Sequence, residues 1–211
     1  MSKINNFVIE NGVLVDYEGE ETDIVIPDGV VRIDSAAFAT LKIVSVVVPD
    51  SVVEIDSDAF RGCQNLSNVK LGASVKHIGD RAFYECYGIE EIVLPDSVEI
   101  IGEDAFFGCE SLEKIVIPDS LKIIGNCAFQ CTALERVKLG SSIKHIGEQA
   151  FSECFNLVEI IIPDSIQFIG EDAFDECNPD EGGICVRGTW GGYANKYCEK
   201  NSIAFWEYVF K

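Results

Sequence analysis

The chain has 211 residues, a hydrophobic content of 47% and a formal net charge of −20. This length suits one sizeable domain or two small ones, and the apolar content excludes a disordered chain. The negative charge argues against nucleic acids and anionic membrane surfaces as partners, because both attract basic proteins. No run approaches about 18 apolar residues, so we expect no membrane insertion, and the first residues lack the apolar segment of a signal peptide.

An Ala-Phe pair recurs along most of the chain at intervals of 22 or 23 residues. A period between about 20 and 50 residues is the mark of a repeat architecture. An active-site motif is expected once and a structural rung many times, so the motif GEDAF at 102–106 and 170–174 is interpreted as part of a rung. The phenylalanines of these pairs are Phe38, Phe60, Phe83, Phe106, Phe129, Phe151 and Phe174.

Each repeat begins with a predicted β-strand that has one buried face. In residues 86–106 the apolar side chains of Ile89, Ile92 and Leu94 follow the pattern L-xx-L-x-L. Apolar and other residues alternate at the end of this pattern, which indicates an extended strand. Pro95 then ends the strand, because proline has no amide hydrogen for the next ladder bond.

A return arm and a corner complete the repeat. Val98 and Ile101 are predicted to lie on the return arm, and the Ala-Phe pair that follows is predicted to fill the interior. One rung cannot bury its own apolar edge, so we expect the rungs to stack with their strands parallel. The glycines before the Ala-Phe pairs are interpreted as bends that need a positive φ; they are Gly79, Gly102, Gly125, Gly147 and Gly170.

Six of the nine cysteines keep the repeat register and are interpreted as small buried side chains without a metal or redox role. Cys131 follows its Phe by two residues where the others follow by three, and Cys127 with Cys131 forms a weak CxxxC signal. Cys185 and Cys198 lie outside the repeats and are candidates for a disulfide. The six are Cys63, Cys86, Cys109, Cys131, Cys154 and Cys177.

The repeated pattern L-xx-I-x-I-P-x-S-V-xx-I-G-xx-A-F-xx-C, carried at 112–131 and in its neighbours, resembles the BspA-like leucine-rich repeat family. The resemblance covers residues 23–177, which form one continuous repeat domain, and departs from the family at Gly72 and Gly140, where the family has proline. It implies a right-handed leucine-rich repeat solenoid of about seven coils with capped ends. The parallel sheet is expected on the concave face, with irregular or short 3-10 return arms.

The same resemblance implies a cap at each end of the solenoid. Residues 1–22 resemble an incomplete first coil, and residues 178–211 resemble a C-terminal cap with a short helix. The aromatic residues of the second segment are interpreted as a plug for the final coil, with a carbohydrate-stacking platform as the alternative. They are Trp190, Tyr193, Tyr197, Phe205, Trp206 and Tyr208.

The residues between the buried positions of each strand are predicted to face outward in two rows, which form the candidate binding surface. An exposed aliphatic stripe indicates a partner, whereas β-propensity alone would also place Val and Ile there, and both interpretations stay open. The central row, after Val25, is Val47, Lys70, Val93, Val116, Lys138 and Ile161. The flanking row, after Asp23 and Ser45, is Asn68, Glu91, Lys114, Arg136 and Glu159.

We expect neither catalysis nor a metal or other cofactor. The chain has no nucleophile, phosphate-loop, zinc-protease or dinucleotide motif, and His77 and His145 are echoes of one repeat position 68 residues apart. The acidic turns after the strands offer too few carboxylates per rung for a calcium site, so a solvated acidic edge is favoured.

These observations predict a non-enzymatic module that binds a protein through the concave sheet. The family resemblance implies a cell-surface or secreted protein with a role in adhesion. An intracellular scaffold or adaptor in the cytoplasm is the first alternative, because many thiols are expected to be unpaired. A calcium- or glycan-binding structural module is the second, and self-association through the aliphatic stripe is a further expectation.

Overall fold

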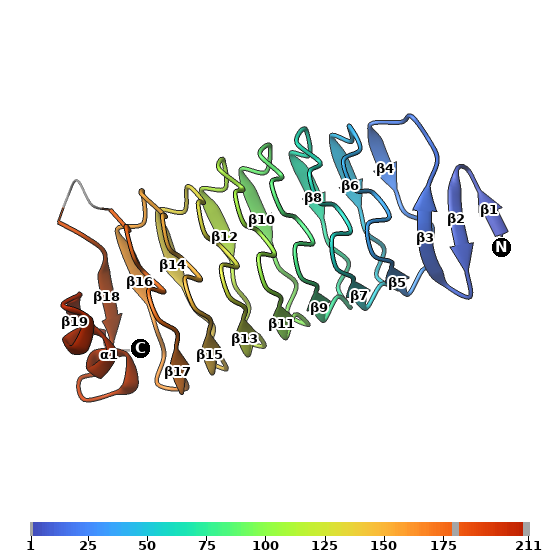
Figure 1. Ribbon diagram of the computed structural model, residues 1–211. Coiled ribbons are helices and arrows are strands. Elements are labelled where there is room, and N and C mark those ends of the chain that lie inside the picture. The colour runs from blue at the N-terminus through green and yellow to red at the C-terminus, as the bar shows by residue number, and fades with distance from the viewer. Residues whose placement is uncertain (1, 179–181, 209–211) are drawn as a thin grey trace.

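The computed structural model describes residues 2–178 and 182–208 and shows an elongated solenoid of stacked rungs (Figure 1). In a typical rung, a three-residue strand leads through a turn into a two-residue strand and then a corner. The predicted repeat solenoid with parallel strands is therefore confirmed. The helix α1 (Tyr193–Asn201) lies at the C-terminal end of the described part.

The L-x-L segments form a parallel face, which we call the strand face. Neighbouring rungs keep one register, so that Ile92 lies opposite Ile115 and Val137 opposite Ile160. The face is divided into three sheets, with breaks between β8 and β10 and between β12 and β14. Its strands are β4 (Asp23–Val25), β6 (Ser45–Val47), β8 (Asn68–Lys70), β10 (Glu91–Val93), β12 (Lys114–Val116), β14 (Arg136–Lys138), β16 (Glu159–Ile161), β18 (Cys185–Gly188) and β19 (Ala204–Glu207).

The return arms are more regular than we predicted. Instead of irregular or 3-10 segments, they contain short strands that join one ten-stranded sheet. Each arm places an aliphatic side chain such as Ile101 or Ile124 inside, and its backbone pairs with the arms above and below. The return-arm strands are β5 (Arg32–Ile33), β7 (Glu54–Ile55), β9 (His77–Ile78), β11 (Ile100–Ile101), β13 (Ile123–Ile124), β15 (His145–Ile146) and β17 (Phe168–Ile169). The sheet is extended at its N-terminal end by β1 (Ser2–Ile4), β2 (Phe7–Glu10) and β3 (Val13–Tyr17), of which β1 and β2 and also β2 and β3 pair antiparallel, while β3 pairs parallel with β5.

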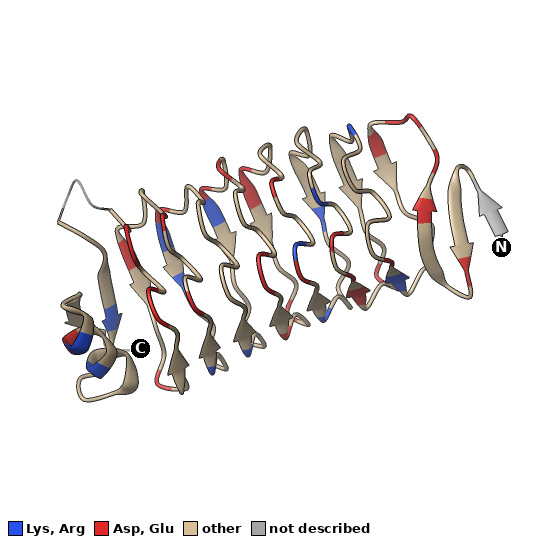
Figure 2. Cartoon of the chain, in the orientation of Figure 1, with Lys and Arg blue, Asp and Glu red and all other residues tan. Residues whose placement is uncertain are grey.

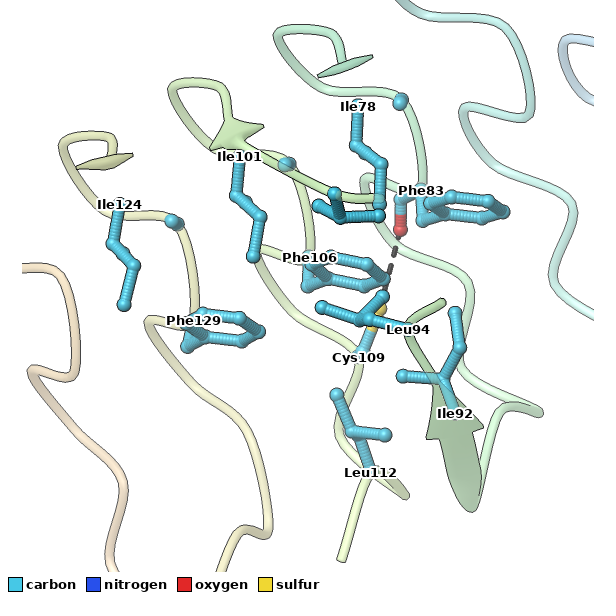
Figure 3. Packing of buried hydrophobic residues seen from close by; sticks show 14 of the residues in the cluster. Ile78, Phe83, Ile92, Leu94, Ile101, Phe106, Cys109, Leu112, Ile124 and Phe129 are labelled. Carbon is cyan, nitrogen blue, oxygen red and sulfur yellow. Dashed lines mark hydrogen bonds between the residues drawn. The ribbon is translucent and has the colours of Figure 1, made fainter. Parts of the chain in front are cut away.

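The Ala-Phe pairs build a stack of phenylalanine rings along the solenoid axis (Figure 3). The ring of Phe106 lies 5.2 Å from that of Phe83 and 5.3 Å from that of Phe129, with nearly parallel planes. Tyr17 of β3 continues the stack at one end and Tyr197 of α1 closes it edge-on at the other. Stacked aromatic pairs contribute beyond their buried area, so each rung stabilises its neighbours.

The glycines before the Ala-Phe pairs are selected by close packing, and the predicted positive φ is wrong. A Cβ on Gly125 would lie 2.5 Å from the backbone carbon of Gly102, so no side chain fits between successive rungs. The left-handed conformation occurs two residues later, where Asp104 has a φ of 54° and Asp172 a φ of 53°. Aspartate and asparagine tolerate this conformation better than most residues, which accounts for part of the acidic character of the corners.

The cysteine ladder differs from the prediction at one rung. Cys109 lies inside and donates a hydrogen bond from Sγ to the carbonyl oxygen of Phe83 at 3.2 Å. In the short rung this place is taken by Thr132, whose Oγ1 bonds the carbonyl oxygen of Phe129 at 2.9 Å, while Cys131 is half-exposed at the corner with a φ of 58°. The short rung therefore has one residue fewer on the C-terminal side of the ladder position, and not on its N-terminal side. The ladder cysteines are Cys63, Cys86, Cys109, Cys154 and Cys177.

All nine cysteines are free, so the structure contains no disulfide. The suggested pair of Cys185 and Cys198 is therefore absent. Burial raises the pKa of the Cys109 thiol to about 12 and that of Cys154 to about 12. The ladder thiols are consequently neutral and unreactive in the folded protein.

The Pro-Asp-Ser turns connect one rung to the next. Ser97 donates a hydrogen bond from Oγ to the carbonyl oxygen of Val75 at 2.6 Å, and Ser120 does the same to Val98 at 2.7 Å. Where the next rung has glycine in place of proline, the aspartate accepts from its backbone, as Asp119 does from the amide of Ser141 at 2.7 Å. This bond lowers the pKa of Asp119. The acidic turns are thus structural ties between rungs.

Candidate functional site

The structure places all predicted residues of the central row on the strand face. Val25, Val93 and Val116 are 68%, 54% and 51% exposed, Lys70 and Lys138 are exposed, and Val47 and Ile161 are half-buried. Neighbours in the row are opposite each other wherever the sheet is continuous. These register pairs are Val47 with Lys70, Val93 with Val116, and Lys138 with Ile161.

The central row continues into the C-terminal cap, beyond the residues predicted from the repeat pattern. Arg187 of β18 lies opposite Ile161, and Trp206 of β19 lies opposite Arg187. Trp206 is 62% exposed and does not plug the final coil as predicted. The alternation around the buried Val186, after a glycine-rich segment, was the available sequence signal for a further strand.

The other cap aromatics divide between plug and surface. Tyr197 and Phe205 are half-buried and pack against the core, as a plug requires. Trp190 and Tyr193 are exposed. The predicted aromatic plug is therefore correct for only part of the cluster: β19 turns Trp206 outward beside the inward Phe205, Trp190 lies in the segment before α1, and Tyr193 is the first residue of that helix.

The flanking row carries opposite charges in register. Arg136 and Glu159 lie opposite each other, with Nη1 and Oε2 at 3.1 Å, and the guanidinium of Arg187 binds the other carboxylate oxygen of Glu159. Glu91 and Lys114 share a register position and are both exposed. Surface ion pairs of this kind contribute about 0–1 kcal/mol. The side chain of Arg136 is 68% exposed and that of Glu159 only 18%, so the basic member of the pair is the one that a partner can reach.

The two rows are basic in an acidic protein. Five of the 16 Lys and Arg residues lie in the rows and their continuation on β18, against three of the 36 Asp and Glu residues. Figure 2 shows blue segments on β12, β14 and β18 and red segments on β4, β10 and β16, with further red in the turns and corners. The basic side chains are Lys70, Lys114, Arg136, Lys138 and Arg187; the acidic ones are Asp23, Glu91 and Glu159.

A groove of about 650 Å³ lies on the strand face, at the break between β8 and β10. Among the described residues no backbone hydrogen bond joins these two strands. The side chains of Val69 and Leu71, which occupy core positions, are only half-buried there, whereas Ile92 and Leu94 are buried. The groove lining includes Ser45, Val47, Asn68, Lys70, Glu91 and Val93.

The described residues contain no group of three or more His, Cys, Asp or Glu side chains that could hold a metal ion. His145 stacks on Phe168 with ring centroids 4.5 Å apart, and its echo His77 is exposed beside Ile100. No helix in the described part of the chain is both long and apolar enough to cross a bilayer. The strand face is therefore the site with the most distinctive chemistry.

Comparison with known proteins agrees with this architecture. The model of the BspA type leucine rich repeat region matches residues 16–89 and 76–200, with six copies of the repeat. The chain belongs to the BspA-type leucine-rich repeat family. The crystal structure of a leucine-rich repeat protein from T. pallidum is 33% identical over 78% of this chain and 80% of that chain, with a TM-score of 0.72.

A second solved structure with a similar fold is that of a leucine rich cell surface protein from Faecalibacterium prausnitzii A2-165. It is 24% identical over 86% of this chain and 68% of that chain, with a TM-score of 0.57. No match was found among curated protein sequences. Leucine-rich repeat proteins are typically interaction modules without enzymatic activity, because stacked rungs offer an extended surface and no enclosed active site.

Proposed function

We propose that this BspA-type protein binds another protein through its strand face. The observation that supports the proposal most strongly is the central row, in which exposed Val93 and Val116 lie between Lys70 and Lys138. β-propensity explains valine in a strand, but it does not explain why basic side chains gather on this face of a chain with a net charge of −20.

The chemistry of the face defines the partner. Aliphatic side chains flanked by Lys and Arg suit a surface that offers apolar contacts bordered by carboxylates. The groove beside β8 adds an apolar floor formed by Val69 and Leu71. A partner that is basic overall would be attracted to the turns and corners instead, because these carry most of the acidic residues.

A binding array with paired variants tests the proposal. The array holds purified extracellular-matrix proteins, host glycoproteins and cytosolic proteins, and the labelled protein is applied beside a Val93→Lys, Val116→Lys variant. We expect the variant to lose at least tenfold in affinity for any protein that binds, because it places two charges in the apolar part of the row. Equal binding by the two would place the site elsewhere and overturn the proposal.

The return-arm sheet supplies a matched control. Val53 and Ile123 are aliphatic, 39% and 38% exposed, and lie on the return arms. A Val53→Lys, Ile123→Lys variant adds the same charge to a surface that the proposal does not use. It should bind as the unmodified protein does, and a loss equal to that of the strand-face variant would indicate a general charge effect.

A role in adhesion at the cell surface is the finer form of this proposal, and a cytoplasmic scaffold is its alternative. Support for the first comes from family membership, and support for the second from the nine free thiols, which suit a reducing compartment. Binding restricted to matrix proteins or host glycoproteins would favour adhesion. Binding restricted to cytosolic proteins would favour the scaffold.

A second candidate function is glycan binding at the C-terminal cap. A pocket of about 640 Å³ lies between β17 and α1, and its walls include Phe168, Tyr193 and Tyr197. Aromatic faces beside the carboxylates of Glu148 and Glu171 suit a sugar ring and its hydroxyl groups. A Tyr193→Ala variant on a glycan array should lose the signal if this pocket binds sugar, whereas the strand-face variant should keep it.

A further inference from the structure

The short rung around Thr132 leaves a notch in the side of the solenoid. Longer rungs make a turn after the ladder cysteine, at Glu110 in the rung before and at Phe155 in the rung after. In the short rung Ala133 joins Thr132 directly to the buried Leu134, so this turn is missing. The result is a cavity of about 360 Å³ between the two flanking turns.

The lining of the notch is aromatic and acidic. Phe155 is 55% exposed at one wall, and the carboxylates of Glu110 and Glu153 lie at the others. Glu153 accepts hydrogen bonds from the side-chain amide of Gln130 at 2.9 Å and from the thiol of Cys131 at 3.6 Å. Neither carboxylate forms an ion pair with any residue in 2–178 or 182–208.

The negative field of these carboxylates is visible in a neighbouring group. The pKa of the Cys131 thiol is raised to about 11, by partial burial and by the charge of Glu153. Burial is the larger cause and disfavours charge of either sign, but the part that comes from the charges of Glu153 and Glu110 favours a cation at this place. An exposed aromatic face adds to that preference, because its ring electrons attract a positive charge.

The other short rung of the chain contains a cation of its own at the matching place. Phe38 is followed by Leu41 and Ile43 with the same spacing that separates Phe129 from Thr132 and Leu134. The residue between the two apolar positions is Lys42 in the first short rung and Ala133 in the second. At this position the first short rung has the exposed side chain of Lys42, whereas the second has only the methyl group of Ala133.

We propose that this notch receives a lysine or arginine side chain of a partner protein. The alkyl part of the side chain would lie against Phe155 and Ala133, and the ammonium or guanidinium group would lie between Glu110 and Glu153. This contact is separate from the strand face, so a partner would need a basic residue at the notch and an acidic border elsewhere. The notch should therefore still bind a basic side chain when residues of the strand face are changed.

Backbone amide spectra of the full chain test the proposal, with N-acetyl-lysine amide and N-acetyl-arginine amide as probes and N-acetyl-norleucine amide as the uncharged control. We expect saturable shifts of the amides of Thr132, Ala133 and Asn156 with the two cationic probes, at a Kd on the order of 1 mM as befits so small a ligand. The norleucine probe should shift these amides at least about tenfold less. Equal shifts with all three probes would overturn the proposal.

Three variants locate the contact. Ala133→Lys places a cation of the chain itself in the notch, at the position that Lys42 has in the first short rung, and should abolish the shifts. Glu110→Gln and Phe155→Ala act on exposed side chains and should each weaken binding by about threefold or more. The Val93→Lys, Val116→Lys variant of the strand face should bind the probes unchanged, so the two proposals fail or succeed independently. Probe binding that Ala133→Lys leaves intact would place the cation elsewhere and overturn the proposal.

Discussion

The return arms and the strand face are built from the same rungs, yet the return arms join one sheet that is continuous over ten strands, including the N-terminal β1 to β3, and the strand face is divided into three sheets. On the return-arm side the Ala-Phe corners repeat from rung to rung, and each side chain stacks on its own kind. On the strand face the outward residues change from Val to Lys to Glu. Both breaks in that face adjoin a rung that has glycine where others have proline, at Gly72 and Gly140.

This difference shows which parts of a rung bind it to its neighbours and which residues can vary without loosening the stack. The corner backbone is bonded from rung to rung, as in the 2.8 Å bond from the amide of Phe106 to the carbonyl oxygen of Ala128. The interior stack and this backbone ladder supply the nearest-neighbour interaction that a solenoid needs. Outward residues of the strand face contribute little to that interaction, so they are free to specify a partner.

The largest expected effect is alkaline unfolding through the cysteine ladder. The folded pKa of Cys109 and Cys154 is about 12, above the ordinary value of 9.0. A raised pKa gives stability that is complete below pH 9 and is lost as the pH rises toward 12, at about 1.4 kcal/mol per thiol and pH unit. Urea midpoints measured from pH 8 to 11 should fall steeply above pH 9.

Thr132 provides the control for this prediction, because it occupies the ladder position without an ionisable thiol. A Cys109→Thr, Cys154→Thr variant should be less stable at pH 8 but should lose less stability between pH 9 and 11. The same pH slope in both proteins would show that tyrosine and lysine titration causes the alkaline transition.

Truncation of the ring stack is the next effect in size. Phe106→Ala removes a fully buried ring from the middle of the stack and should lower the free energy of unfolding by about 3–5 kcal/mol. Phe107→Ala removes a half-buried ring that stacks only on Tyr84 at the surface, and should lower it by less than half as much. Urea denaturation followed by circular dichroism measures both, and equal losses would contradict the role of the interior stack.

A methyl group added at Gly140 tests the close contact between rungs. Its Cβ would lie 2.1 Å from the carbonyl oxygen of Pro118, so one rung must shift. We expect Gly140→Ala to cost about 1–3 kcal/mol in urea denaturation. Ser141→Ala changes an exposed neighbour and should stay within about 0.5 kcal/mol. A neutral Gly140→Ala would mean that the rungs adjust without loss.

The repeated residues made the rung predictable, and departures from the repeat were predicted poorly. Spacing of the Ala-Phe pairs and of the L-x-L positions located the interior and both outward rows, because the buried face of a strand fixes its register. Trp206 was not predicted as a member of the central row, since β18 and β19 follow a glycine-rich segment and a helix that interrupt the period. The glycines before the Ala-Phe pairs were predicted to have a positive φ, because their contact with the preceding rung, as between Gly125 and Gly102, leaves no local signal in the sequence.

The smallest expected effect concerns the short rung, in which Cys131 was predicted at the ladder position and the structure places Thr132 there. If Thr132 holds the ladder position, Thr132→Cys should change the free energy of unfolding by less than about 1 kcal/mol, since the pocket already accepts a thiol in five other rungs. Cys131→Ala should cost no more than about 0.5 kcal/mol, because the side chain is half-exposed. Cys109→Ala, by contrast, removes a buried hydrogen bond and packing and should cost about 1–2 kcal/mol.

Thiol titration of the folded protein tests the same point independently: Cys131 should react with a small disulfide reagent before any ladder cysteine does. If Cys131 reacted slowly and Cys131→Ala caused a large loss of stability, then Cys131 would lie in the interior, and the notch beside it would not exist.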